Sequence, residues 1–237
     1  MSILFISDVH LSCERPDIVR AFLDFLDQRA IAAKALYILG DLFEAWIGDD
    51  DTSKIPSVVK HGLRSLSDHG VNIFIQHGNR DFLLGQKFMQ ETGSTLLPDE
   101  YIFDGYGYSA LLMHGDSLCT DDQDYQRFRR KSRHPVYKWI LSNMPLRYRQ
   151  NLASKWRQQS ADANSRKTES IMDVNQQTIA TVTEKYQITR LIHGHTHRPC
   201  IHQTSALERI VLGDWYDMGW CLTLNEEGFK QDSWPIL

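Results

Sequence analysis

The sequence is poor in cysteine and has no long apolar run. Its four cysteines are scattered without a Cys-x-x-Cys spacing, so neither a zinc knuckle nor a disulfide framework is indicated, and a reducing compartment is the simpler expectation. No apolar stretch approaches the ~20 residues that a membrane-spanning helix needs. The N-terminus enters an apolar run without the basic flank and cleavage site of a signal peptide. We therefore expect a cytoplasmic protein that is soluble or at most bound to a membrane surface.

Excess charge of one sign is also lacking, since the net charge is only −4 at pH 7, but the charges are unevenly distributed. Residues 125–167 contain twelve lysines and arginines and a single acidic residue, Asp162. Aromatic and aliphatic side chains recur among these bases at helical spacing, including Trp139, Leu146 and Trp156. Basic, aromatic-rich amphipathic helices are typical of elements that bind membrane surfaces.

Three roles of this basic segment are compatible with its composition. Its apolar side chains could simply pack the helices onto the rest of the protein, which is the commonest role of such a stripe. Its bases could contact the backbone of a nucleic acid. In the third role, the apolar side chains line a groove for acyl chains while the bases meet anionic headgroups and a substrate diphosphate. We expect one domain over residues 1–237, with a helical cap inserted over residues 120–167 that covers the active site.

Five short polar motifs stand at the ends of apolar runs. Together they supply two aspartates, one asparagine and four histidines, a set that suits Mn²⁺, Fe or Zn²⁺ rather than a thiolate site. Seven ligands are too many for one tetrahedral ion and suit two ions that share a ligand, which indicates two-metal hydrolysis of a phosphorus ester or anhydride. Each motif alone is weak, but the ordered set is strong. The motifs are Asp8-Val9-His10, Gly40-Asp41, Gly78-Asn79-Arg80-Asp81, His114-Gly115-Asp116 and Gly194-His195-Thr196-His197.

Each motif follows a run that predicts a buried strand. Open α/β sheets place their sites at the carboxyl ends of strands, and every candidate ligand lies at such an end. Asp8 and His10 follow the run at residues 3–6, and an extended backbone would aim both side chains to the same side. Glycines in the motifs let the backbone turn sharply beside the ions. The other runs are residues 35–39, 71–75, 110–113 and 190–192.

The order and identity of these motifs resemble those of the calcineurin-like metallophosphoesterase superfamily, over residues 3–217. The resemblance implies an α/β fold, a four-layer α/β/β/α sandwich of two mixed sheets with a dinuclear site at one edge. It implies two divalent metal ions, of which Mn²⁺ is the expected identity. It assigns Asp8, His10 and His197 to the first ion, Asn79, His114 and His195 to the second, and Asp41 to both. The residues expected to be catalytic are Asp41, Asn79, Arg80, His114 and His195.

Three stretches are similar to one branch of that superfamily, the diphosphatases of lipid A synthesis in Gram-negative bacteria. They are GDLFEAWIGDD at 40–50, GNRD at 78–81 and DSLCTDD at 116–122. The similarity implies that water activated by two metals attacks the α-phosphorus of UDP-2,3-diacylglucosamine. The products would be UMP and 2,3-diacylglucosamine 1-phosphate (lipid X). It also implies a peripheral position on the cytoplasmic face of the inner membrane and no nucleic acid partner.

The chemistry of Arg80 also favours a diphosphatase. Many members of the superfamily carry histidine at this position, where the imidazole can protonate a leaving alkoxide. Arginine is always charged and is a poor general acid, but its fork suits a phosphate. A phosphoanhydride releases a phosphate monoester, which needs no proton, so the arginine favours cleavage of a diphosphate. A surface ion pair of Arg80 is the alternative.

Three polar residues near the end of the basic segment, Ser160, Asn164 and Lys167, have the spacing of one helical stripe. From the residues alone, a solvated polar face is the simpler interpretation. The resemblance instead assigns substrate contacts to these three residues and to Asn79, Arg80, Asp122 and His195.

Other residues near the motifs are expected to have supporting roles. His193 alternates with two proposed ligands, and we interpret it as a structural residue at a strand end. Asp81 and Asp116 flank ligands and are expected to orient them by hydrogen bonds.

The rest of the chain predicts further helices and strands. Short strands after His197, around residues 199–202, 209–212 and 220–224, are expected to complete the second sheet. Helices are expected near residues 17–30, 56–69, 82–91 and 169–186.

Two functions are compatible with the sequence. One is the metal-dependent diphosphatase described above. The other is a nucleic-acid phosphodiesterase of the same superfamily, which would use the same metals while its basic segment grips a phosphate backbone.

Overall fold

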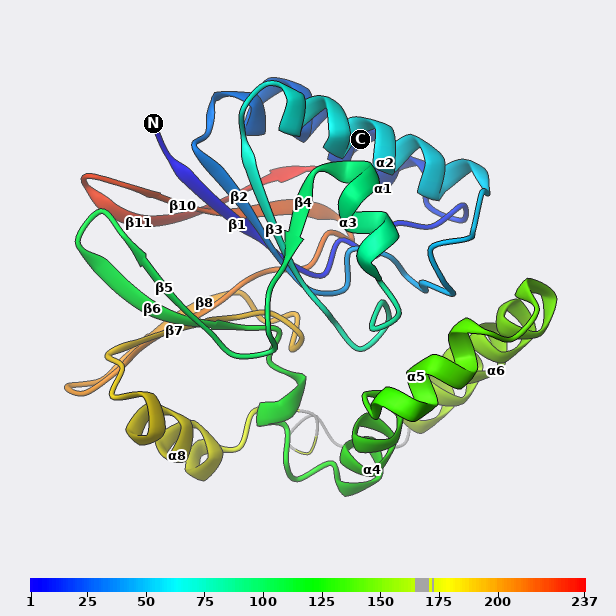
Figure 1. The fold of residues 1–237 in the computed structure, drawn as a ribbon. Helices are drawn as coiled ribbons and strands as arrows, with labels where there is room; N and C mark the ends of the chain where they lie inside the picture. Colours follow the sequence, from blue (N-terminus) through cyan, green and yellow to red (C-terminus); the bar gives the residue numbers. More distant parts are fainter. Residues whose placement is uncertain (165–170, 172) are drawn as a thin grey trace.

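The computed structural model describes residues 1–164, 171 and 173–237. Two mixed β-sheets lie face to face, and helices cover the outer face of each (Figure 1). The predicted four-layer α/β/β/α architecture is therefore confirmed.

The first sheet has six strands in the order β11-β10-β1-β2-β3-β4. Parallel pairing joins β1 to β2, β2 to β3 and β3 to β4, whereas β10 runs antiparallel to both β1 and β11. The strands are β1 (Ile3–Ile6), β2 (Ala35–Leu39), β3 (Asn72–Gln76), β4 (Ser94–Leu96), β10 (Met218–Asn225) and β11 (Gly228–Pro235).

The second sheet has five strands in the order β5-β6-β7-β9-β8. Its central strands β6, β7 and β9 are parallel, and an antiparallel strand flanks them on each side. The strands are β5 (Tyr101–Gly105), β6 (Tyr108–Met113), β7 (Arg190–His193), β8 (Cys200–Gln203) and β9 (Glu208–Val211).

Helices form the two outer layers and a projection at one side of the molecule (Figure 1). Those over the first sheet are α1 (Pro16–Gln28), α2 (Lys54–Asp68) and α3 (Gln86–Thr92), and α8 (Gln176–Tyr186) covers the second sheet. Between β6 and α8 lie α4 (Gln123–Ser132), α5 (Pro135–Ser142) and α6 (Leu146–Asn164), called the α4–α6 segment below. The structure also has two short 3₁₀ turns, η1 (Ala30–Ala32) and η2 (Asp116–Leu118).

Strand alternation divides the apolar side chains among three cores. On β1, Leu4 and Ile6 face the outer helices, whereas Ile3 and Phe5 face the second sheet. This follows from the two-residue repeat of a strand, which sends neighbouring side chains to opposite faces. A third core lies between the second sheet and α8, where Leu111 and Leu191 pack against Ile179. Both sheets are thus buried on two faces, which explains why their central strands are continuous apolar runs.

Two expected helices differ from the structure in their bounds. The helix expected at 82–91 begins only at Gln86, because residues 82–85 form a turn. In the range expected as one helix at 169–186, α8 begins at Gln176, where the Asn175 side chain accepts hydrogen bonds from two backbone N–H groups, and non-helical residues 173–175 separate it from the helical residue 171. Of the expected range, residues 169, 170 and 172 lie outside the described part of the chain.

The expectation that all the late strands complete the second sheet is only partly right. β8 and β9 do join it, but β10 pairs with the edge of β1 in the first sheet, where Phe5 lies opposite Leu222. This pairing covers the edge of β1 that β2 leaves open and places Leu222 and Leu224 in the core between the sheets. The alternation of apolar residues in a strand predicts which side chains are buried, but it does not predict which strand lies beside it.

The described helices include none that is long and apolar enough to span a bilayer. All four cysteines are free thiols.

Phe5 offers a test of the core between the sheets. It is fully buried and its ring contacts those of Tyr37 and Phe103. Phe5→Ala should lower the free energy of unfolding by about 3–5 kcal/mol, because it removes buried apolar area and leaves a cavity. Urea denaturation measures the effect. Ile102→Ala, at a position 37% exposed on β5, should cost about 1 kcal/mol or less, and equal losses would contradict the assignment of this core.

Candidate metal centre

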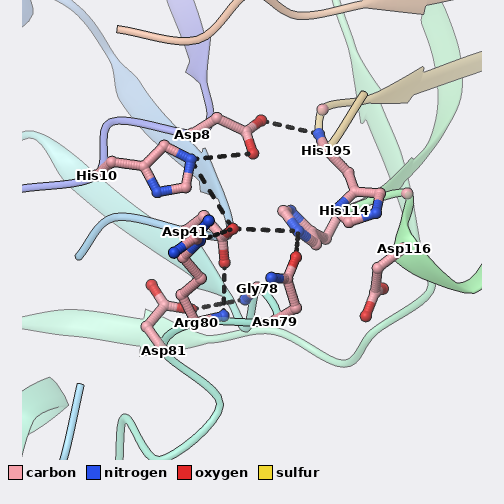
Figure 2. A network of polar contacts seen from close by, with 12 residues as sticks. Asp8, His10, Asp41, Gly78, Asn79, Arg80, Asp81, His114, Asp116 and His195 are labelled. Atoms are coloured by element: carbon pink, nitrogen blue, oxygen red, sulfur yellow. Dashed lines mark hydrogen bonds and ion pairs between the residues drawn. The ribbon is translucent and has the colours of Figure 1, made fainter. Parts of the chain in front are cut away.

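The predicted ligands come together at one edge of the two sheets, just after strands β1, β2, β3, β6 and β7 (Figure 2). Asp8, His10, Asp41 and His114 point toward one another, and Asn79 lies beside His114. Parallel strands end at the same edge of their sheet, so residues up to 187 positions apart become neighbours.

The backbone at these positions is left-handed rather than extended. Asp8, His10 and Asp41 have φ angles of 53°, 54° and 51°, and His195 and His197 have 68° and 55°. They are five of the seven non-glycine residues with positive φ in the described chain. The expectation of an extended backbone at Asp8 and His10 was therefore wrong, although the two side chains do point to the same group of ligand atoms. Left-handed geometry costs a residue with a Cβ about 1–2 kcal/mol, and such strain clusters at functional sites.

Glycines allow the loops to approach one another closely. A Cβ on Gly78 would lie 2.0 Å from Asp41 Oδ1, and one on Gly194 would lie 2.2 Å from Asp8 Oδ2. Neither position can hold a larger residue without displacing a candidate ligand.

One group of ligand atoms comprises those of Asp8, His10 and His197, which lie within 4.8 Å of one another. Asp8 Oδ1 is 3.9 Å from His10 Nε2 and 3.3 Å from His197 Nε2, and the two ring nitrogens are 3.3 Å apart. Asp8 Oδ1 is buried and has no hydrogen bond of good geometry. An unsatisfied buried carboxylate oxygen facing two imidazole nitrogens fits a divalent cation.

A second group comprises Asp8, Asp41 and His114. Asp41 Oδ2 lies 3.8 Å from His114 Nε2 and 4.0 Å from His10 Nε2, between the two groups. Asn79 Oδ1 is 3.0 Å from His114 Nε2. The central position of Asp41 is what a carboxylate shared by two ions requires.

His195 lies at the edge of the second group. Its backbone N–H donates to Asp8 Oδ2 at 2.9 Å, and its ring centroid lies 5.0 Å from that of His114. Within the described residues, its side chain does not belong to either compact group of ligand atoms. The structure therefore brings His195 to the site without fixing its role.

Charges in the site shift the pKa values of its groups in opposite directions. Burial alone would raise the pKa of Asp8, but His197, His114 and His10 hold it far below its usual value. Burial opposes a charge on His197, yet Asp214 and Asp8 raise its pKa to about 10. Burial lowers the pKa of His195 to about 4, with a contribution from His114. Without a cation, the imidazoles thus supply positive charge that balances the buried carboxylates.

The supporting roles of Asp81 and Asp116 differ from those expected. Asp81 accepts hydrogen bonds from the backbone N–H groups of Gly78 and Leu42, so it ties together two loops rather than a ligand side chain. Burial and the neighbouring Asp41 raise the pKa of Asp81 to about 6. Asp116 bonds to the α4–α6 segment instead, through the Tyr125 hydroxyl at 2.6 Å and Arg129 Nε at 2.8 Å.

The interpretation of His193 as a structural residue is supported. Its ring is fully buried in β7, with Nδ1 2.9 Å from the Gly194 carbonyl and Nε2 3.2 Å from Arg209 Nη1. Burial lowers the pKa of His193 to about 3.

The expected substrate contacts are only partly placed. Asn79 and Arg80 lie beside the metal groups, and Arg80 Nε is 4.0 Å from Asp41 Oδ2. Asp122 is buried at the start of α4, where its carboxylate accepts from the Tyr125 backbone N–H. Lys167 and the side chains of Ser160 and Asn164 lie outside the described residues.

Comparisons with known proteins agree with this geometry. The model of the calcineurin-like phosphoesterase family matches residues 1–199. The chain belongs to this family. Relatives named UDP-2,3-diacylglucosamine hydrolase in Pseudomonas aeruginosa and Cellvibrio japonicus are each 49% identical to it over 240 residues, with 100% of both chains covered. A solved archaeal phosphodiesterase with 13% identity aligns with a TM-score of 0.51 over 99% of this chain and 100% of its own, a likeness of fold.

As a member of the calcineurin-like phosphoesterase family, the chain is a hydrolase, and the family implies divalent metal ions. The two groups of ligand atoms offer oxygen and imidazole donors that fit such ions.

Two residues near the ligands were missed by sequence reasoning. The carboxylate of Asp214, which lies between the strands expected at 209–212 and 220–224, is 3.4 Å from His197 Nδ1. Tyr125 brings its ring centroid to 5.9 Å from that of His195. A search for carboxylates that accept the outer N–H of a ligand histidine could have suggested Asp214, but only contacts in space identify which carboxylate it is.

Asp41 provides the test of the centre. Asp41→Ala should abolish metal-dependent hydrolysis and reduce the bound metal, because both groups lose the carboxylate between them. Elemental analysis and hydrolysis of bis(p-nitrophenyl) phosphate measure the two effects. Asp104→Ala, at an exposed position on β5, is the control. Activity like that of the unmodified protein would disprove the central role of Asp41.

Proposed function

We propose that the chain hydrolyses the diphosphate of UDP-2,3-diacylglucosamine at the α-phosphorus, giving UMP and 2,3-diacylglucosamine 1-phosphate (lipid X), a step of lipid A biosynthesis. The full-length similarity to hydrolases named for this substrate supports the proposal. The structural observation that carries it is an apolar cavity beside the metal groups.

This cavity has a volume of about 410 Å³ and lies between the loops of the first sheet and the α4–α6 segment. Its lining includes Asn79 and Arg80, which lie beside the metal groups, together with apolar side chains such as those of Phe82, Phe128 and Trp156 and a few further charged residues. Polar residues beside the metal centre and apolar side chains in one lining match a substrate that joins a diphosphate to acyl chains. We therefore assign the α4–α6 segment as a cap over the active site, within the expected range of residues 120–167.

Arginines of the proposed cap form ion pairs with aspartates in the rest of the protein. Arg129 and Arg133 both pair with Asp99, at 2.9 and 3.1 Å. Arg149 is buried and pairs with Asp50. These contacts engage three of the twelve bases of residues 125–167 within the protein. The apolar side chains of the cavity favour the lipid substrate over the nucleic-acid alternative. The α4–α6 segment thus both packs onto the rest of the protein and lines the cavity.

The residues at the centre have distinct roles in the proposed reaction. Asp41 and Asp8 hold cations, and Asn79 and Arg80 bind the diphosphate beside the metal groups. Arg80 places a permanent positive charge on the phosphoryl oxygens and cannot serve as an acid, which suits a leaving phosphate that needs no proton. When bound, two divalent ions, which we propose are Mn²⁺, activate water and neutralise charge on the phosphoryl group. His114 and His195 complete the proposed catalytic set, and Ser160, Asn164 and Lys167 remain proposed sugar-phosphate contacts.

The outer surface of the cap supports a position at the cytoplasmic face of the inner membrane. Val136 and Trp139 on α5 are 58% and 67% exposed, and Arg130 and Lys131 at the end of α4 are exposed nearby in the chain. Exposed apolar and basic side chains on two consecutive helices suit an anionic membrane surface. Substrate with two acyl chains would be taken directly from that surface.

An isotope experiment tests the proposed reaction. Metal-depleted protein is supplied with Mn²⁺ and incubated with UDP-2,3-diacylglucosamine in ¹⁸O water, and the products are examined by mass spectrometry. We expect the label in UMP, because attack at the α-phosphorus adds the water oxygen there. Label in the lipid phosphate would place attack at the other phosphorus, and absence of cleavage would contradict the proposed function. Chelated protein without added metal is the control.

Trp156 tests the assignment of the cavity. Its ring lies in the cavity and its centroid is 5.3 Å from that of Phe128. Trp156→Ser should raise KM for the diacylated substrate at least about 10-fold, since one large apolar contact contributes about 1.5–3 kcal/mol, while hydrolysis of bis(p-nitrophenyl) phosphate changes little. Trp139→Ser, on the exposed face, is the matched control and should leave KM for detergent-dispersed substrate unchanged. Equal losses with both substrates would mean that Trp156 serves packing alone.

A further inference from the structure

Glu44 lies between the candidate metal ligand His10 and the proposed substrate-binding residue Arg80. It stands three residues after Asp41, in the loop that follows β2, and its side chain lines the apolar cavity. Its two carboxylate oxygens face different groups. Oε2 lies 3.2 Å from His10 Nδ1, and Oε1 accepts a hydrogen bond from Arg80 Nη1 at 2.5 Å.

The contact with His10 is directed at the nitrogen that faces away from the metal groups. His10 Nε2 points toward the carboxylates of Asp8 and Asp41, at 3.9 and 4.0 Å. A histidine that binds a cation through Nε2 must be neutral, with its proton on Nδ1. His10 Nδ1 is buried without a hydrogen bond of good geometry, so the carboxylate of Glu44 is placed to accept that proton after a small rotation of the ring.

The contact with Glu44 fixes one nitrogen, Nη1, of the flexible Arg80 side chain. Nη1 is held by Glu44, Nε lies 4.0 Å from Asp41 Oδ2, and the Arg80 backbone N–H donates to Asp41 Oδ1. Across the described residues, the structure gives Nη2 no acceptor. An arginine fixed at one corner presents its remaining N–H groups to a phosphate with less loss of conformational freedom.

Glu44 thus has one contact on each side. Its Oε1 accepts a hydrogen bond from Arg80 Nη1, and its Oε2 faces His10 Nδ1 at 3.2 Å.

We infer that Glu44 is a positioning residue that orients the His10 imidazole toward the cation and the Arg80 guanidinium toward the substrate phosphate, so that a single carboxylate couples metal binding to substrate binding. Glu44 touches neither the reacting phosphorus nor the cation. The part concerning Arg80 depends on the proposed function, whereas the part concerning His10 does not.

Metal titration tests the His10 part without any substrate. Glu44→Ala and Glu44→Gln are stripped of metal and titrated with Mn²⁺ by calorimetry. We expect the affinity of one ion to fall about 10- to 100-fold in Glu44→Ala, the range found when the outer partner of a ligand is removed, with a smaller loss in Glu44→Gln. Glu91→Gln is the matched control, because Glu91 also contacts two bases, Lys60 and Lys87, but on α2 and α3. Unchanged Mn²⁺ affinity in both Glu44 variants would overturn this part.

Kinetics at saturating Mn²⁺ test the Arg80 part. Glu44→Ala should raise KM for UDP-2,3-diacylglucosamine more than it lowers kcat, and the Glu44→Ala/Arg80→Ala double variant should have nearly the KM of Arg80→Ala alone. Effects that multiply would show that Glu44 does not act through Arg80. A purely structural Glu44 would lower the melting temperature of the metal-free protein while Mn²⁺ affinity and KM stay at the unmodified values, which also overturns the inference.

The two proposals can fail separately. If the unmodified protein binds Mn²⁺ and hydrolyses bis(p-nitrophenyl) phosphate but leaves the UDP-lipid intact, the proposed substrate is wrong. The Mn²⁺ titration of the Glu44 variants would still decide whether Glu44 orients His10.

Discussion

The structure depends on the confinement of several carboxylates and imidazoles to one small region where strands of both sheets end. Asp8 and Asp41 are almost fully buried there, and burying two carboxylates so close together is costly unless positive charge compensates them. Imidazoles supply part of this compensation, as the lowered pKa of Asp8 and the raised pKa of His197 show. The unsatisfied oxygen of Asp8 indicates that compensation is incomplete without a cation. The fold therefore holds the charges in place, and a metal relieves their repulsion.

The carboxylates and imidazoles of the site are held by strained loops, and these loops in turn need rigid strands around them. Three apolar cores fix the strands, and the left-handed backbone at Asp8, His10 and Asp41 is tolerated because backbone hydrogen bonds link their loops. The N–H of Asp8 donates to the Gly40 carbonyl and that of His10 donates to the Asp41 carbonyl. Asp81 adds a further link through its two backbone contacts. Stability in the cores thus offsets strain at the site, which is a common arrangement in enzymes.

The α4–α6 segment connects this centre to an apolar cavity. Asp116 follows the ligand His114 by two residues and accepts hydrogen bonds from Tyr125 and Arg129 of α4. Arg133 also donates to the carbonyl of Gly78, in the loop that carries Asn79. The position of the helices is therefore coupled to the loops of the metal groups, and both contribute to the lining of the cavity. Glu44, which also lines the cavity, connects two of the loops through His10 and Arg80.

Much of this organisation could be predicted from the sequence, because strand ends in parallel sheets are local features with recognisable residues. The strand runs, the five motifs, the four-layer fold and the basic insertion were all evident from composition and spacing or from the family they resemble. The pairing of β10 with β1, the left-handed turns at the ligands and the contacts of Asp214 and Glu44 were not. The split within the apolar stripe was also hidden, since Trp156 faces the cavity while Trp139 faces outward. By itself the sequence determined the elements and the chemical types of the ligands, because these depend on neighbours along the chain. Only the tertiary structure decided which strand, carboxylate or tryptophan meets which partner, because those contacts join distant residues and depend on how the layers pack.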